Sequence, residues 1–242
     1  MKLAVIPARG GSKRIPRKNI KSFCGKPMIA WSIEAALQSG CFDHVVVSTD
    51  DAEIADVARQ CGAQVPFMRP TTLSDDHTGT IPVIRHAIEW FSEQGQVSDQ
   101  VCCVYATAPF VGAADIRRGL DILTGAGSDY AFAVTKYPFP IQRAIRITDQ
   151  GRVEMFNPEH FNTRSQDLEE AYHDAGQFYW GRATAWLTSK VIFGPNAAPI
   201  QLPRYRVQDI DTVEDWQMAE YLFQAVNLKG DSDQSTNQGK SK

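Results

Sequence analysis

The N-terminal stretch contains a loop whose charges and small side chains suit phosphate binding. The loop follows an apolar run at residues 3–6, which we predict to be a buried strand, and it reads PARGGSKRIPRKNIK. Its glycines leave backbone N–H groups accessible, and no acidic residue precedes Glu34. Free N–H groups beside lysine and arginine are what a polyphosphate requires. The cations are Arg9, Lys13, Arg14, Arg17, Lys18 and Lys21.

The same loop has a simpler interpretation as an exposed basic turn after an edge strand. We consider this the weaker one, because protein surfaces usually intersperse the two signs of charge. The loop matches neither the GxxxxGK[ST] pattern of P-loops nor the GxGxxG pattern of dinucleotide folds. It therefore predicts a nucleotide site of another type.

Two carboxylates near the other end of the chain could bind a metal ion. Asp209 and Asp211 alternate along a predicted strand at residues 206–210, which would place both on one face. Such a pair of hard oxygen ligands suits Mg²⁺. In the alternative, Asp211 and Glu214 form a variant capping box for the last helix, which leaves Asp209 unexplained. We favour a metal pair.

Histidines offer weaker signals. His173 and Asp174 could be an acid–base pair or a structural hydrogen bond, and the sequence leaves both open. His77 lies beside Asp76 in a polar loop at residues 71–80, which lines the site or is simply solvated. The other histidines show no metal-ligand spacing.

The predicted elements bring these residues to one place. Strands at residues 3–6, 45–47, 64–68 and 100–105 alternate with helices at 26–39, 52–60, 81–94 and 113–125. This alternation predicts an α/β fold with a doubly wound, mostly parallel sheet. Ligands of such sheets bind beyond the carboxyl ends of the strands, where the basic loop, residues 48–50, Arg69 and Thr107 would meet.

The pattern changes after residue 129. A strand at residues 130–135 leads into an excursion at 136–172, with a predicted hairpin of 143–148 and 152–156 that would serve as a lid or an oligomer arm. A strand at 176–180, a short helix to 189, the strand at 206–210 and a helix at 212–226 follow. We predict one domain at residues 1–228 and a disordered tail at 229–242.

Composition limits the function further. The chain has 242 residues, 43% of them hydrophobic and 22% charged, with a net charge of −3. The basic loop is thus a local feature, and we expect no nucleic-acid partner. No apolar run approaches the roughly 20 residues of a membrane span, and no signal peptide is apparent. The 5 scattered cysteines form no CxxC pair, so we expect a cytoplasmic protein without a membrane partner.

Four segments in order resemble the signature of the CMP-sugar-acid synthetases, the acylneuraminate cytidylyltransferases: residues 6–20, 47–50, 69–70 and 209–211. The resemblance implies a nucleotide-diphospho-sugar transferase-like fold. It also implies that CTP and a nine-carbon 2-keto sugar acid give a CMP-sugar and pyrophosphate, with Mg²⁺ as cofactor. It implies a homodimer whose excursion reaches into the partner's site.

The resemblance also implies roles for individual residues. The catalytic residues would be Arg9, Lys18 and Asp211, and the metal ion would be bound by Asp209 and Asp211. The nucleotide would be bound by Ala8, Arg9, Gly10, Gly11, Ser12, Lys18, Asn19, Arg69, Asp76, His77 and Thr78. The sugar acid would be bound by Tyr105, Thr107, Arg143, Arg164, His173, Asp174 and Gln177.

Two strings differ from the sialic acid enzymes. Residues 105–109, YATAP, replace Gln-Pro-Thr-Ser-Pro, and residues 173–176, HDAG, replace Arg-Pro-Asn-Gly. Both resemble the pseudaminic acid cytidylyltransferases, which supply the glycosylation of flagellin or surface polysaccharide. The expected reaction is a Mg²⁺-assisted, in-line attack of the anomeric hydroxyl on the α-phosphate. The alternatives are the same reaction on N-acetylneuraminic acid or Kdo, and a non-catalytic nucleotide-binding scaffold.

Overall fold

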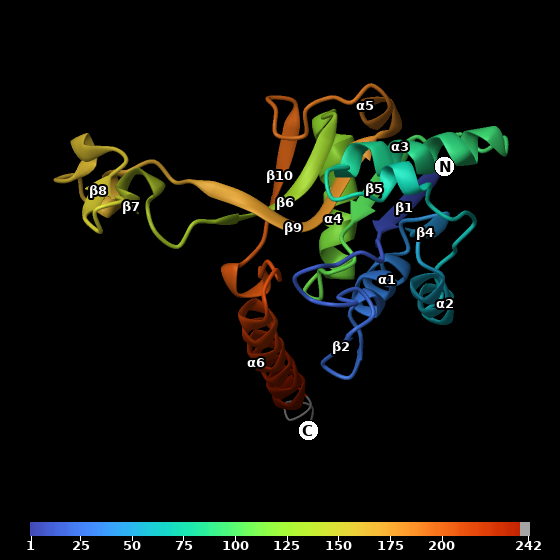
Figure 1. Ribbon diagram of the computed structural model, residues 1–242, viewed down its shortest axis with the longest axis horizontal. Coiled ribbons are helices and arrows are strands. Elements are labelled where there is room, and N and C mark those ends of the chain that lie inside the picture. Colours follow the sequence, from blue (N-terminus) through green and yellow to red (C-terminus); the bar gives the residue numbers. More distant parts are fainter. Residues whose placement is uncertain (238–242) are drawn as a thin grey trace.

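A six-stranded sheet forms the centre of the molecule, with strand order β10-β6-β9-β5-β1-β4 (Figure 1). This computed structural model describes the backbone of residues 1–237 and the side chains of residues 1–226. The strands are β1 (Lys2–Pro7), β4 (His44–Ser48), β5 (Gln100–Val104), β6 (Tyr130–Lys136), β9 (Tyr172–Arg182) and β10 (Ala197–Gln201).

The sheet is mostly parallel, as predicted. β1 pairs in parallel with β4 and β5, and β6 pairs in parallel with β10. β9 runs antiparallel between β5 and β6 and joins the two parallel parts. The carboxyl ends of β1, β4 and β5 therefore meet the amino end of β9 at one edge.

Helices cover both faces of the sheet, because successive strand side chains point in opposite directions. Ala4 and Ile6 of β1 pack in one core cluster, with residues of α1, α2 and α4. Leu3 and Val5 pack in the other, with residues of α3 and α5. The helices are α1 (Met28–Ser39), α2 (Ala52–Gln60), α3 (Thr80–Glu93), α4 (Ala113–Ala126), α5 (Ala183–Leu187) and α6 (Val213–Asn237).

Two predicted strands are wrong. Residues 64–68 contribute only an isolated bridge from Gln64 to Val46, and Pro66 has no N–H to continue a ladder. Residues 206–210 lie outside the sheet, after a short 3-10 turn at Arg204–Arg206. The edge beside β6 is instead taken by β10, which the sequence analysis missed, and β9 begins earlier than predicted, at Tyr172.

The predicted excursion is present as an arm between β6 and β9. It projects away from the sheet and carries the expected hairpin of β7 (Ile145–Ile147) and β8 (Val153–Met155), as Figure 1 shows. The side chains of β7 are all exposed. A small two-stranded sheet of β2 (Ser22–Phe23) and β3 (Lys26–Pro27) precedes α1.

The last helix extends past the predicted domain boundary at residue 228. α6 continues to Asn237, so residues 229–237 are helical where the sequence predicts a disordered tail. Helix propagation costs little per residue once a helix is nucleated, and α6 begins on packed residues such as Trp216 and Phe223. Residues 238–242 of the predicted tail lie outside the described residues. In the described part of the chain, no helix is long and apolar enough to span a membrane.

Candidate active site

The basic loop is shaped by its own hydrogen bonds. It leaves β1 where the Ala8 N–H donates to the Ser48 carbonyl at 2.9 Å, and it turns back so that the Asn19 amide donates to the Arg9 carbonyl at 2.9 Å. The Gly10 N–H donates to Asp50 at 3.0 Å. A Cβ at Gly10 would lie 2.7 Å from the Asp51 carboxylate, so a larger residue would push the loop outward.

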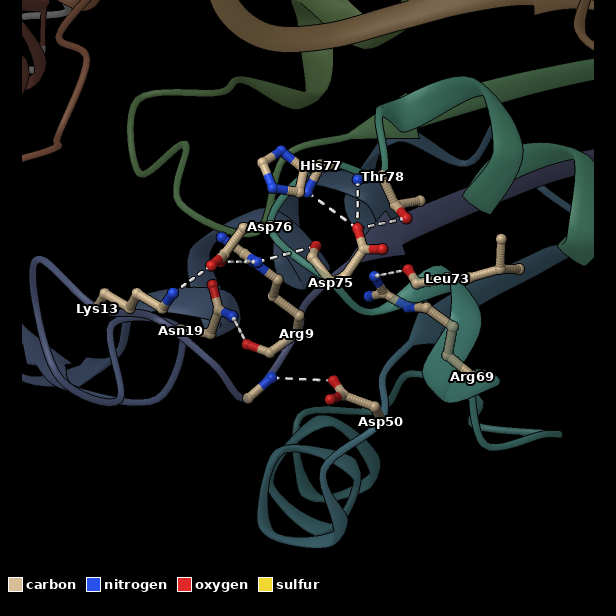
Figure 2. A network of polar contacts seen from close by, with 11 residues as sticks. Arg9, Lys13, Asn19, Asp50, Arg69, Leu73, Asp75, Asp76, His77 and Thr78 are labelled. Carbon is tan, nitrogen blue, oxygen red and sulfur yellow. Dashed lines mark hydrogen bonds and ion pairs between the residues drawn. The ribbon is translucent and has the colours of Figure 1, made fainter.

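Carboxylates from distant parts of the chain neutralise the cations of this loop. Arg9 pairs with Asp76 at 2.6 Å, and Lys13 pairs with the other oxygen of the same carboxylate. Arg14 pairs with Asp211 at 2.8 Å. Figure 2 shows Arg9 and Lys13 converging on Asp76. The sequence places no acidic residue nearby, and the fold supplies several.

The loop at residues 71–80 is held in a tight turn. The Asp75 carboxylate accepts hydrogen bonds from the His77 N–H at 2.9 Å and from the N–H and hydroxyl of Thr78 at 2.6 and 2.8 Å (Figure 2). These bonds, the Thr78 hydroxyl first, lower the pKa of Asp75. The Arg9 guanidinium also donates to the Asp75 carbonyl at 3.0 Å. The turn is thereby fixed against the basic loop.

A cavity of about 370 Å³ opens between these segments and is called the basic cavity here. It brings together residues from the basic loop, the 71–80 turn, the loop after β5 and the segment before α6. Its lining is Pro7, Arg9, Ser12, Lys13, Arg14, Lys18, Asn19, Asp76, Thr107 and Asp211. This set includes five of the predicted nucleotide residues, namely Arg9, Ser12, Lys18, Asn19 and Asp76.

A second cavity of about 290 Å³, the His173 cavity, adjoins the first and shares Thr107 with it. Asp209 lines the His173 cavity, whereas Asp211 lines the basic cavity. The carboxylate pair therefore stands between the two. The lining is Tyr105, Thr107, His173, Asp174, Ala175, Gly176, Val207, Gln208 and Asp209.

The capping alternative for Asp211 is wrong, because another residue caps α6. Asp215 accepts from the N–H of Thr212 at 2.7 Å, and its own N–H donates to the Thr212 hydroxyl at 3.2 Å, which completes a capping box. The Asp211 carboxylate is instead directed to Arg14 and Lys18. It remains available to a cation that enters the basic cavity.

Two carboxylates suit a magnesium ion that takes its remaining ligands from water and phosphate oxygens. The pKa of Asp209 is raised, first because surrounding protein displaces water from its carboxylate and second because Asp211 carries the same charge. A divalent cation would relieve this repulsion. Within the described residues, no group of three or more histidine, cysteine or acidic side chains could hold a metal ion alone.

The sequence leaves two interpretations open for His173 and Asp174, and the hydrogen bonds of their side chains do not support the acid–base pair. The His173 Nδ1 lies 2.9 Å from the backbone carbonyl of Asp174, whereas the Asp174 carboxylate accepts from the Tyr179 hydroxyl and, at 3.0 Å, from the Gly176 N–H. Burial is the main reason why the pKa of Tyr179 is raised, so its phenol remains a donor. The structural alternative for Asp174 therefore holds.

Several predicted site residues lie away from both cavities. Arg69 is 6% exposed and donates to the carbonyls of Ser48 at 2.5 Å and Leu73 at 3.4 Å, which ties β4 to the 71–80 loop. Gln177 is also buried. Arg143 and Arg164 lie on the arm, where Arg164 pairs with a neighbouring carboxylate. Ala8, Gly10, Gly11, His77 and Thr78 shape the loops rather than line the cavities.

A third cavity of about 400 Å³ was not anticipated. It lies beyond Tyr105 and Asp174, so these two residues separate it from the His173 cavity. Scattered apolar residues from four segments form its walls, and no local pattern in the sequence marks them. The lining is Gly79, Thr80, Ile81, Pro82, Tyr105, Asp174, Tyr179, Ile192 and Phe193.

Comparisons with known proteins identify the family of the chain. A family described as Cytidylyltransferase matches residues 3–227. A pseudaminic acid cytidylyltransferase of Campylobacter jejuni subsp. jejuni is 48% identical over 91% of this chain and 95% of that protein. A CMP-N,N'-diacetyllegionaminic acid synthase of Legionella pneumophila subsp. pneumophila is 34% identical over 92% and 96%.

Solved structures share the fold. A CMP:2-keto-3-deoxy-manno-octonic acid synthetase complexed with CTP superposes with a TM-score of 0.69 at 16% identity, covering 93% of this chain and 98% of that one. With the family match over nearly the whole chain, the conclusion is direct: the chain belongs to the cytidylyltransferase family.

Proposed function

We propose that this chain transfers CMP from CTP to pseudaminic acid, giving CMP-pseudaminic acid and pyrophosphate. The observation that carries the proposal is the position of Asp209 and Asp211 between two adjoining cavities, one of them lined by cations. Such a site can hold a nucleotide triphosphate on one side and an acceptor on the other. Relatives named pseudaminic acid cytidylyltransferase match over most of the chain and support this choice of substrates.

The basic cavity would bind the triphosphate. Arg9, Lys13 and Lys18 place positive charge on its walls, and Ser12 and Asn19 add hydrogen-bonding groups. As the anomeric oxygen forms its bond to the α-phosphorus, the bond from that phosphorus to pyrophosphate breaks and negative charge grows on the leaving group. Preorganised cations stabilise such charge more than water does.

The carboxylate pair would align the reaction at the junction of the cavities. Asp209 and Asp211 would hold Mg²⁺, which when bound supplies positive charge at the α-phosphate and favours ionisation of the attacking hydroxyl. Arg14 and Lys18 pair with Asp211 in this structure, and with a metal ion on that carboxylate they would be free to contact the phosphates. Alignment of the two substrates would then supply much of the rate enhancement.

The His173 cavity would receive the sugar acid, with Thr107 and Asp174 as polar contacts. A carboxylate substrate also needs a cation, and the predicted ones, Arg143 and Arg164, lie on the projecting arm. We therefore propose a homodimer in which the arm of one protomer completes the site of its partner. Exposed apolar side chains on the arm favour such a contact: Phe139, Ile141, Ile145, Ile147, Val153, Phe156 and Phe161.

The test is release of pyrophosphate from CTP and Mg²⁺ in the presence of single sugar acids. We expect turnover with pseudaminic acid to exceed that with N-acetylneuraminic acid, N,N'-diacetyllegionaminic acid and Kdo. Preference for one of the other acids would replace the proposed substrate but keep the reaction. No release with any acid, in a protein that still binds CTP, would favour a nucleotide-binding scaffold.

A further inference from the structure

The segment that carries Asp209 and Asp211 is not held by a β-ladder. After the Leu202 N–H donates to the Val134 carbonyl, the backbone hydrogen bonds of residues 203–207 are local, within the turn at Arg204–Arg206. A pair of metal ligands nevertheless needs a fixed geometry, because Mg²⁺ demands a near-ideal octahedron. Side chains must therefore position this segment.

One side-chain cluster fixes the segment on its N-terminal side. The Arg206 guanidinium donates to the Asp115 carboxylate at 2.5 Å and to the Phe110 carbonyl at 3.2 Å. The Gln177 amide donates to the Arg206 carbonyl at 2.5 Å. We call Arg206, Asp115 and Gln177 the Arg206 anchor. A Cβ at Gly112 would lie 2.8 Å from the Arg206 guanidinium, so a glycine is needed beside it.

The anchor is largely shielded from solvent, which makes its bonds stronger than surface contacts. The side chain of Asp115 is 11% exposed and that of Arg206 is 25% exposed. Charged hydrogen bonds of this kind are strong where water is excluded. Asp115 also pairs with Arg118 at 3.1 Å, but Arg118 is half exposed and donates to the Gln201 carbonyl, outside the 206–211 segment.

The C-terminal side of the segment is fixed independently. Ile210 is 1% exposed and packs in the core cluster that includes Trp216. The Asp211 N–H donates to the Asp215 carboxylate at 3.1 Å, within the cap of α6. Asp209 thus lies between two fixed points, with the Arg206 anchor and the Val207 side chain, which packs against the core, on its N-terminal side.

We infer that the Arg206 anchor is a positioning device for the Asp209–Asp211 pair, an inference that rests on the proposed metal-dependent transfer. Gln177 acts in it through the backbone of Arg206, and its own side chain is buried. Without the anchor, both carboxylates are still present, but the distance between them is no longer fixed. Groups that orient metal ligands in this way typically change metal affinity or activity by about 10- to 100-fold when removed.

The test compares Arg206→Gln and Asp115→Asn with Arg118→Gln, a matched control that removes the other cation on Asp115. Binding of Mn²⁺ is titrated by the spectroscopic signal of the free ion in the presence of CTP. Hydrogen exchange of the amides of residues 206–211 is measured in the same proteins. Pyrophosphate release against Mg²⁺ concentration gives kcat and the half-saturating Mg²⁺ concentration.

We expect Arg206→Gln and Asp115→Asn to bind Mn²⁺ at least about 10-fold more weakly and to exchange these amides faster. The KM for CTP should change less than about twofold, because the phosphate-binding loop is untouched, and Arg118→Gln should resemble the wild type. Arg206→Lys keeps a cation for Asp115 and should lie in between. This variant also tests the inference if Arg206→Gln fails to fold.

Unchanged Mn²⁺ affinity and Mg²⁺ dependence, with only a lower Tm, would overturn the inference and leave a structural ion pair. Failure of the proposed function gives a different result. In that case the wild type would release no pyrophosphate with any acid, while the anchor variants would still weaken Mn²⁺ binding.

Discussion

Lys18 and Asp211 lie 3.5 Å apart, although 193 residues separate them in the chain. The Lys18 side chain is 15% exposed and that of Asp211 is 34% exposed, so the contact forms inside the basic cavity. It closes the site by joining the loop after β1 to the segment before α6. Before substrate binds, the proposed metal ligand therefore already has cationic partners.

Replacement of Asp211 by asparagine should abolish most turnover without unfolding the protein. Asparagine keeps the shape of the side chain but loses the charge that a metal ion needs. Groups that only orient metal ligands typically change activity by roughly 10- to 100-fold when removed, so loss of a direct ligand should lower activity by more than that. Pyrophosphate release over a range of Mg²⁺ concentrations measures the loss. Asp121→Asn, an exposed position on α4, is the control. Full activity of Asp211→Asn at limiting Mg²⁺ would refute the metal assignment.

The raised pKa of Asp209 predicts a pH effect. Its carboxylate gains a proton at a higher pH than an ordinary aspartate, so apparent Mg²⁺ affinity should fall as the pH drops through that raised pKa. The folded state also binds this proton more tightly than the unfolded state does. Ionisation of Asp209 therefore lowers the free energy of unfolding as the pH rises through the same pKa.

Removal of the Asp209 charge should then stabilise the metal-free protein at neutral pH. We expect Asp209→Asn to raise Tm by about 1–2 °C without Mg²⁺. The variant should also lose any stabilisation that Mg²⁺ and CTP together give the wild type. Thermal unfolding with and without these ligands measures both effects. A lower Tm without Mg²⁺ would contradict the repulsion between Asp209 and Asp211.

Arg69 should prove to be mainly a structural residue. Its guanidinium is buried, which lowers its pKa, and it holds the carbonyls of Ser48 and Leu73. Arg69→Met leaves these acceptors without their donor and should destabilise the fold by about 1–3 kcal/mol. Urea unfolding measures this, with the exposed Arg59→Met as control. Unchanged stability with a strongly raised KM for CTP would restore the predicted contact to the nucleotide.

A charge on the arm should weaken the proposed dimer. Ile147 is 77% exposed in β7, so Ile147→Lys should not disturb the protomer but would bury a charge at an apolar interface. We expect at least about a tenfold rise in the dimer dissociation constant, measured by sedimentation. Val97→Lys, 71% exposed and away from the arm, is the control. An unchanged dimer would place the interface elsewhere.

Local patterns in the sequence were enough to predict most of the sheet and the arm. Helix α2 has the predicted bounds, and the broken pattern after β6 correctly predicts where the arm begins. Residues 206–210 were predicted to be a strand because Val207 and Ile210 are typical strand residues, whereas the chain there is fixed by Gln177 and Arg206. β10 was missed because it contains Pro199 and two alanines.

The pairing of charges in the site could not be predicted, because it depends on contacts between distant residues. The basic loop has no acidic residue close in sequence, but the fold brings Asp76 to Arg9 and Lys13. The same fold brings Asp211 to Arg14. Sequence chemistry identified the residue types of the site, and tertiary structure determined their partners.

Because β9 runs antiparallel to its neighbours, the residues that would select the nucleotide and those that would select the acceptor lie in different parts of the chain. The basic loop follows the end of β1, whereas residues 173–176 lie near the start of β9 and reach the same edge from the opposite direction. If the proposed function is correct, separate stretches of the gene therefore encode the specificity for the nucleotide and the specificity for the acceptor. Evolution can alter the acceptor by exchanging the first residues of one strand while the machinery for the donor stays fixed.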